Sequence, residues 1–252
     1  MLEIKNFTKK YGNFVAVDDL SLTVEDGEIY GFIGHNGAGK STTIKAVVGA
    51  LGFETGEIRI DGISVKNNPL GAKRVLAYVP DNPDIYDYLT GIQYLNFVCD
   101  VFKVGKKERN ERIRKYAEAF ELSSSLGDTI GSYSHGMKQK LVLISALVHN
   151  PKLLILDEPF VGLDPIAAHK LKEIMRDICE RGGAIFFSTH VLEVAEKLCD
   201  RVGIIKKGRL VAEGTIKEVV GDKSLESIFL EIEGEKTEEE KAASSAKADE
   251  EK

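Results

Sequence analysis

The sequence "GHNGAGKST", residues 34–42, decides how the chain folds around it. It matches the pattern G-x-x-x-x-G-K-[ST] in full, after the β-prone "EIYGFI" and before "KSTTIKAVVGAL", which has helical spacing. Glycines let consecutive N–H groups surround phosphate oxygens, Lys40 offsets β/γ-phosphate charge, and the Ser41 hydroxyl can bind Mg²⁺. A loop that only turns the chain is the alternative, but the context favours a phosphate-binding loop. Its predicted nucleotide-binding residues are Gly34, His35, Asn36, Gly37, Ala38, Gly39, Lys40, Ser41 and Thr42.

A second motif, "LLILDEP" at residues 153–159, lies downstream of this loop. Its four apolar residues predict a buried strand whose C-terminal end presents two carboxylates. Asp157 suits a magnesium-bound water, and Glu158 suits polarisation of an attacking water. A strand that ends in an acidic turn is common by itself. Downstream of a phosphate-binding loop, the metal and catalytic interpretation is favoured.

Two shorter motifs follow. "FFSTH" ends an apolar strand with His190, and a lone histidine at a strand end is more often structural than catalytic. A neutral imidazole near a γ-phosphate could instead bind both phosphate and water. "GLDP", residues 162–165, predicts a turn and a helix N-cap at Asp164, because Asp before Pro suits the first helical positions.

The pattern of the chain predicts an α/β fold with a P-loop NTPase core, an N-terminal antiparallel β region and an inserted α-helical subdomain. The near-continuous apolar runs "LLIL" and "AIFF" are typical of parallel strands covered on both faces. Between about residues 82 and 150 the spacing becomes helical, in "TGIQYLNFVCDVF", "KKERNERIRKYAEAF" and "HGMKQKLVLISALV". A short helical region is expected near "SLESIFLEI".

Composition limits the classes of protein and partner. The net charge is −6, and residues 233–252 hold eight acidic residues and four lysines, so the rest carries only −2 and has no bulk basic field for nucleic acid. This acidic tail lacks large apolar residues and is expected to be disordered beyond a domain at 1–232. The scattered cysteines favour buried thiols in a reducing compartment. No leader or membrane-spanning run is evident, which predicts a chain that is soluble on its own.

Taken together, these motifs resemble those of the ATP-binding subunit of an ABC transporter, over nearly residues 1–230. An adenine-stacking aromatic, Walker A, Q-loop, signature, Walker B, D-loop and H-loop occur in the family's order, and the resemblance implies that Asp164 is the D-loop residue. The resemblance implies ATP and Mg²⁺ as cofactors and an ATPase activity coupled to transport. Tyr11, 29 positions before Lys40, falls where the family places its aromatic residue. Its implied role is stacking on adenine; a turn tyrosine in "KYGN" is the alternative.

The segment "YSHGMKQKL", residues 133–141, falls where the family carries its signature, usually written LSGGQ. The resemblance implies that Ser134, His135, Gly136 and Met137 bind the γ-phosphate of ATP held by a second ATP-binding subunit, most simply in a homodimer. Ser134 and Gly136 are retained, whereas His135 replaces a glycine and Met137 the common glutamine. An ordinary helix N-cap at Ser134 uses the same N–H groups, so both interpretations can hold.

Asp81 stands at the family's Q-loop glutamine position, in "YVPDNPDIY". A carboxylate there could still approach Mg²⁺, but it adds negative charge beside a polyphosphate, which puts the catalytic rate in doubt. The Q-loop segment, "YS-x-GM" and the C-terminal "GRLVAEGT…SLESIFLEI" resemble the bacterial ABC-2-type exporter branch. That branch implies a polytopic membrane permease as partner and a cytoplasmic location on the inner face of the membrane. Residues 85–102 could contribute a groove for it.

Two other classes compete with a transport ATPase. One is a non-transport ABC ATPase, such as a translation or DNA-repair factor. These usually carry two cassettes or a long coiled coil, and this sequence shows neither. The other is a slow, nucleotide-sensing regulatory subunit, which Asp81 weakly favours. The intact Lys40, Asp157, Glu158 and His190 argue against it.

Overall fold

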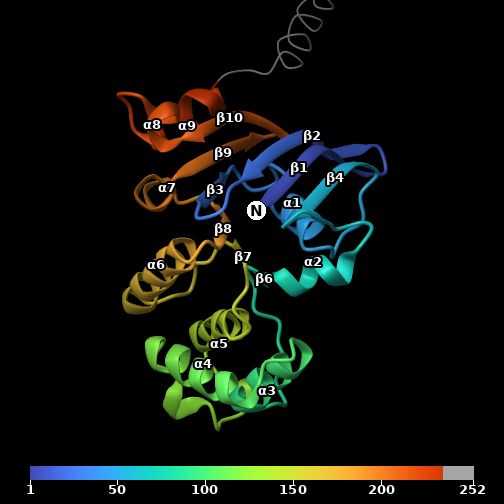
Figure 1. Ribbon diagram of the computed structural model, residues 1–252. Coiled ribbons are helices and arrows are strands. Elements are labelled where there is room, and N and C mark those ends of the chain that lie inside the picture. Colours follow the sequence, from blue (N-terminus) through green and yellow to red (C-terminus); the bar gives the residue numbers. More distant parts are fainter. Residues whose placement is uncertain (235–252) are drawn as a thin grey trace, which may run out of the picture.

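Two β-sheets and a helical lobe make up the described part of the computed structural model, residues 1–234 (Figure 1). The acidic tail that was expected to be disordered begins at residue 233. Glu233 and Gly234 instead form the end of a helix, and the residues from 235 onward lie outside the described part. The strands are β1 (Leu2–Tyr11), β2 (Phe14–Val24), β3 (Ile29–Ile33), β4 (Thr55–Ile60), β5 (Ile63–Ser64), β6 (Leu76–Val79), β7 (Leu153–Asp157), β8 (Ala184–Thr189), β9 (Arg201–Lys206) and β10 (Arg209–Thr215). The α-helices are α1 (Lys40–Val47), α2 (Pro69–Val75), α3 (Gly91–Val101), α4 (Lys106–Ala119), α5 (His135–Leu147), α6 (Pro165–Glu180), α7 (Leu192–Leu198), α8 (Ile216–Val220) and α9 (Leu225–Gly234).

The larger sheet has the strand order β10-β9-β3-β8-β7-β6. Its strands β6, β7, β8, β3 and β9 are parallel, and β10 is an antiparallel edge. Every residue of β3, β7 and β8 is buried, as their apolar sequences predict. The parallel strands therefore place their C-terminal ends, and the loops that follow them, along one edge of the sheet.

The second sheet is antiparallel with the order β2-β1-β4-β5, which confirms the expected N-terminal β region. The two faces of the larger sheet belong to different cores. One face, with Phe32 and Phe186, packs with α1 and the antiparallel sheet. The other face, with Leu154 and Phe187, packs against helices that include α5 and α6. This layering confirms the α/β class inferred from the sequence.

Helices α3, α4 and α5 form a lobe between β6 and β7, at the end of the molecule away from α9 (Figure 1). Thr90 and Gln93 form a capping box at the start of α3, which fixes where that helix begins. The limits of this lobe near residues 82 and 150, and a domain that ends at 232, remain proposals. The short helices α2, α7 and α8 were not anticipated, because five to seven residues show too little helical periodicity.

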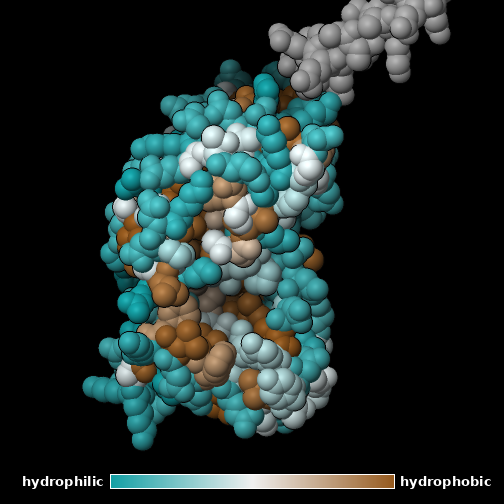
Figure 2. All heavy atoms as spheres, turned by 90° about the vertical axis from the view of Figure 1, so that its right-hand side faces the viewer, coloured by the Kyte–Doolittle hydropathy of each residue, from teal (hydrophilic) through white to brown (hydrophobic). Residues whose placement is uncertain are grey.

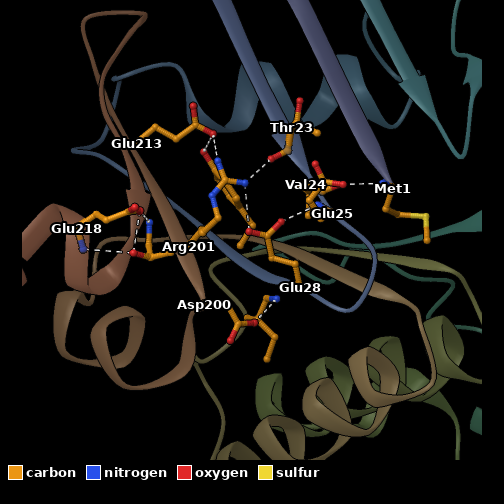
Figure 3. Close-up of polar contacts among 12 residues, drawn as sticks. Met1, Thr23, Val24, Glu25, Glu28, Asp200, Arg201, Glu213 and Glu218 are labelled. Carbon is orange, nitrogen blue, oxygen red and sulfur yellow. Dashed lines mark hydrogen bonds and ion pairs between the residues drawn. The ribbon is translucent and has the colours of Figure 1, made fainter.

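Arg201 joins the two sheets through a polar network at the N-terminal end of β3 (Figure 3). Its guanidinium donates to the Thr23 carbonyl oxygen at 3.1 Å and pairs with Glu28 at 3.3 Å and Glu213 at 2.9 Å. Tyr30 donates to the same Glu213 carboxylate. Burial raises the pKa of Glu28, and the Arg201 charge opposes that rise. The network therefore fixes the sheets relative to each other at the end opposite the loop that follows β3.

The three cysteines, Cys99, Cys179 and Cys199, are buried and free, as expected. Among residues 1–234 no helix is long and apolar enough to span a membrane.

Candidate functional site

The phosphate loop lies between the buried end of β3 and the first residue of α1, Lys40. Two of its glycines sit where no side chain fits. A Cβ on Gly34 would lie 2.5 Å from the Ile205 carbonyl oxygen, and Gly39 combines a φ of 114° with a Cβ position 2.8 Å from the Ala16 carbonyl oxygen. Only glycine suits these positions, and the free N–H groups at the start of α1 face the loop. The backbone thus has the form of an anion-binding site.

Lys40 is buried at the base of this loop, with 5% of its surface exposed. Its ammonium donates to the Gly34 carbonyl oxygen at 2.5 Å and to the His35 carbonyl oxygen at 3.3 Å. Burial lowers the pKa of Lys40, and the nearby charges of Glu158 and Asp157 oppose this shift. The loop therefore holds a buried positive charge close to its unpaired N–H groups.

A cavity of about 300 Å³ opens beside the loop. Its lining residues are Tyr11, Phe14, Ala16, His35, Asn36, Gly37, Gly39, Lys40, Ser41 and Thr42. Tyr11 and Phe14 flank the turn between β1 and β2 and remain 49% and 65% exposed. Exposed rings beside a phosphate loop suit a nucleobase. Phe14 was missed by the sequence analysis, although its place directly after the "GN" turn brings it back beside Tyr11.

Asp157 ends β7 and is only 2% exposed. The Ser188 hydroxyl on β8 donates to its carboxylate. The next residue, Glu158, has a φ of 49°, an uncommon conformation for a residue with a side chain. Its N–H donates to Ser188, to the hydroxyl at 3.1 Å and to the carbonyl oxygen at 3.3 Å. Ser188, which the sequence analysis did not single out, thus supports both carboxylate residues.

The Glu158 carboxylate connects two elements predicted separately. Its Oε1 lies 3.8 Å from Lys40 Nζ and 2.9 Å from His190 Nδ1, and its Oε2 accepts from the His190 backbone N–H at 3.4 Å. Because the carboxylate is the acceptor, His190 donates through Nδ1 and keeps Nε2 for another partner. The structure therefore brings Lys40, Glu158 and His190 into one cluster at the C-terminal edge of the sheet.

Asp81 follows β6, next to β7 in the sheet, and its side chain is exposed. Its carboxylate accepts the Asn82 N–H at 2.8 Å. Burial raises the pKa of Tyr78, and the charges of Asp157 and Asp81 raise it further, which places both carboxylates near this hydroxyl. Asp81 thus lies at the same edge as Asp157, where a Q-loop residue was expected.

The oxygen donors at this edge fit Mg²⁺, which prefers one or two carboxylates together with waters and phosphate oxygens. Asp157 is held in place by Ser188, and Ser41 directly follows Lys40 in the first turn of α1. No cluster of three or more His, Cys, Asp or Glu side chains among residues 1–234 forms an all-protein cation cage. This set suits an ion that is shared with a nucleotide.

The signature segment lies elsewhere, at the N-terminus of α5 in the helical lobe (Figure 1). The Ser134 hydroxyl accepts the Met137 N–H at 3.3 Å, so the expected N-cap is present. No hydrogen bond or ion pair within residues 1–234 links residues 134–137 to the phosphate loop. A single copy of the chain therefore presents two separate candidate phosphate sites.

The D-loop residue Asp164 caps α6, as predicted, by accepting the Ala167 N–H at 2.8 Å. Its other oxygen pairs with Lys140 on α5 at 2.6 Å. These two contacts lower the pKa of Asp164, with the Lys140 contact the larger cause. A Cβ on Gly136 would lie 3.0 Å from the Gly162 carbonyl oxygen, so signature and D-loop also meet through their backbones.

The fold and these sites define an ATP-binding cassette, and comparison with known proteins agrees. A model of the family described as "ABC transporter" matches residues 17–161. The chain is 36% identical over 234 residues to the uncharacterized ABC transporter ATP-binding protein YhcH of Bacillus subtilis, covering 92% of this chain and 75% of that one. It is 35% identical over 215 residues to the linearmycin resistance ATP-binding protein LnrL of the same organism, covering 85% and 69%.

A solved structure of an ATP-binding subunit of an ABC transporter superposes with a TM-score of 0.89 at 35% identity, covering 92% of this chain and 98% of that chain. The chain therefore belongs to the ABC transporter family, as one of its ATP-binding subunits, and it is an ATPase.

Proposed function

We propose that two copies of this chain bind MgATP between them and use its hydrolysis to power export by a separate membrane permease. The observation that carries the proposal is the pair of candidate phosphate sites on different lobes of one copy. The phosphate loop is complete with Lys40 and the carboxylates, whereas the signature helix offers free N–H groups far from it. In a head-to-tail pair, each signature would face the nucleotide on the other copy.

The residues have distinct roles in this proposal. The phosphate loop and Lys40 bind the β- and γ-phosphates, and Tyr11 with Phe14 holds the base. Ser41, Asp157 and Asp81 would hold Mg²⁺, which offsets phosphate charge when bound. Glu158 orients the attacking water and accepts its proton, and His190 fixes the Glu158 carboxylate through Nδ1.

Hydrolysis should tolerate the loss of the charge on Asp81. Asp81→Gln removes a negative charge near the polyphosphate and keeps an oxygen ligand, so steady-state ATP turnover is expected to stay the same or rise. Asp84→Asn is the matched control, because it removes the charge of another exposed carboxylate three residues further along the chain. A loss of more than about tenfold, roughly 1.4 kcal/mol in barrier, would give Asp81 a positive catalytic role. If the wild-type protein and the Asp81→Gln variant both hydrolysed ATP slowly and at the same rate, the result would favour a nucleotide-sensing regulatory subunit.

The permease is proposed to dock where the helical lobe meets the core. Figure 2 shows hydrophobic side chains gathered in a hollow at this junction. A largely apolar groove of about 380 Å³ lies between β6 and the segment after α1 on one side and α3 and α5 on the other, with Tyr94, Val98 and Phe102 in its wall. Such a groove suits the apolar face of a short helix. Docking there would place the chain at the inner face of the membrane. The name of LnrL, a resistance protein, supports export over import.

A charge in the groove should separate the chain from its permease. Val98→Glu is expected to abolish co-purification of a polytopic membrane protein with the tagged chain and to leave basal ATP hydrolysis within about twofold, because a buried carboxylate opposes apolar docking. Gln93→Glu adds the same charge to the same helix and preserves the capping box, so it serves as the control. Unchanged co-purification of the Val98→Glu protein would show that the permease binds another surface.

A further inference from the structure

Helix α9 packs against the phosphate loop. The ring of Phe229, which is 6% exposed, lies 4.8 Å from the imidazole of His35, measured between centroids, with 59° between the planes. Glu233 Oε2 lies 3.9 Å from His35 Nε2. His35 occupies the first x position of the motif G-x-x-x-x-G-K-[ST]. Among residues 1–234, the aromatic ring and the carboxylate that lie beside its side chain both belong to α9.

The helix is held at both ends. At its start, the Leu225 N–H donates to the Glu196 carboxylate on α7 at 2.9 Å. At its end, Lys206 on β9 donates to the Ile232 carbonyl oxygen at 2.5 Å. The neighbouring Ile205 is the residue against which Gly34 packs. The end of β9 therefore supports the phosphate loop and α9 together, and α9 is a fixed element on which the loop can rest.

The contact reaches the phosphate-binding groups through the backbone of His35. Its carbonyl oxygen accepts from Lys40 Nζ at 3.3 Å and from the Ala38 N–H at 3.1 Å. The side chain of His35 is 62% exposed, so the body of the core does not immobilise it. A shift of His35 would move one of the two carbonyl oxygens that accept from the Lys40 ammonium, together with the first N–H groups of the loop.

We infer that Phe229 is a positioning residue for nucleotide binding: α9 holds His35, and with it the first half of the phosphate loop, in the conformation that receives the polyphosphate. This inference rests on the proposed phosphate site. Preorganisation lowers the ordering cost of binding. Because coupling between two sites is reciprocal, a nucleotide in the loop must in turn stabilise the docked α9.

Replacement of Phe229 should weaken MgATP binding without slowing the chemical step. Phe229→Ala is expected to raise KM and the calorimetric Kd for MgATP about threefold to tenfold, with kcat within about twofold of wild type. Phe229→Leu, which keeps the apolar volume, should give a smaller shift and covers the case that the alanine variant folds poorly. Leu230→Ala removes the adjacent side chain, which is 63% exposed, and should change neither constant.

Hydrogen exchange provides a second measurement. MgATP should slow amide exchange across α9 in the wild-type protein and in Leu230→Ala, but less in Phe229→Ala. A merely structural role would lower the active fraction, and so the apparent kcat, while KM stayed constant. Wild-type KM in both Phe229 variants, with α9 exchange unaffected by MgATP, would overturn the inference. If Lys40→Ala also bound MgATP normally, the proposed phosphate site itself would be wrong, so the two failures are distinguishable.

Discussion

Lys40→Ala is expected to abolish tight MgATP binding. The ammonium is buried against the loop and is the cation that the structure places there to balance the β/γ charge. Loop N–H groups alone cannot replace it, and loss of one charged hydrogen-bonding partner costs about 3 kcal/mol, roughly a hundredfold in Kd. Isothermal calorimetry with MgATP measures this loss directly.

Lys45→Ala is the matched control for that experiment. Lys45 lies on the same helix, near its C-terminal end, and is exposed. Its removal takes away the same charge without touching the loop, so Kd should stay within about twofold of wild type. Wild-type affinity in the Lys40→Ala protein would remove the basis for assigning the nucleotide to residues 34–42.

Glu158→Gln should leave MgATP binding intact and reduce hydrolysis by a factor of about 100 to 1,000. The amide keeps the size of the carboxylate but cannot accept the proton of the attacking water, and general-base contributions are of this order. The substitution also removes a negative charge near Lys40, which favours binding of the negatively charged polyphosphate of ATP. Single-turnover hydrolysis and equilibrium binding, measured on the same preparation, separate the two effects.

His190→Ala provides the comparison within the cluster. It removes the donor that orients Glu158 but retains the carboxylate, so its loss of turnover should be smaller than that of Glu158→Gln. A Glu158→Gln protein that hydrolyses ATP at the wild-type rate would assign the general base to another group.

Most of the core was predictable because its signals are local. The phosphate loop has a fixed spacing, and the buried parallel strands are continuous apolar runs, so "LLILDEP" indicates both a strand and the carboxylates at its end. Asp164 was predictable as an N-cap for the same reason, since a cap depends on the residue and the turn that follows it.

The contacts that could not be predicted join residues distant in sequence. Nothing local shows that Ser188 supports both Asp157 and Glu158, because that contact depends on the pairing of β7 with β8. The Lys140–Asp164 pair and the Phe229–His35 contact likewise depend on how helices pack after the sheet has formed. The φ of Glu158 is a further example, because a positive φ outside glycine is imposed by tertiary contacts.

The mass of the Glu158→Gln protein in solution, measured by size-exclusion chromatography with light scattering, tests the two-site account most directly. With saturating MgATP the protein should elute as a dimer, because the ligand stabilises the closed pair and is not consumed, and without nucleotide as a monomer. Adding Ser134→Arg should return it to a monomer that still binds ATP through Lys40, because the guanidinium would occupy the space of the partner's γ-phosphate. A Glu158→Gln protein that stays monomeric at saturating MgATP, even with its permease present, would contradict the account.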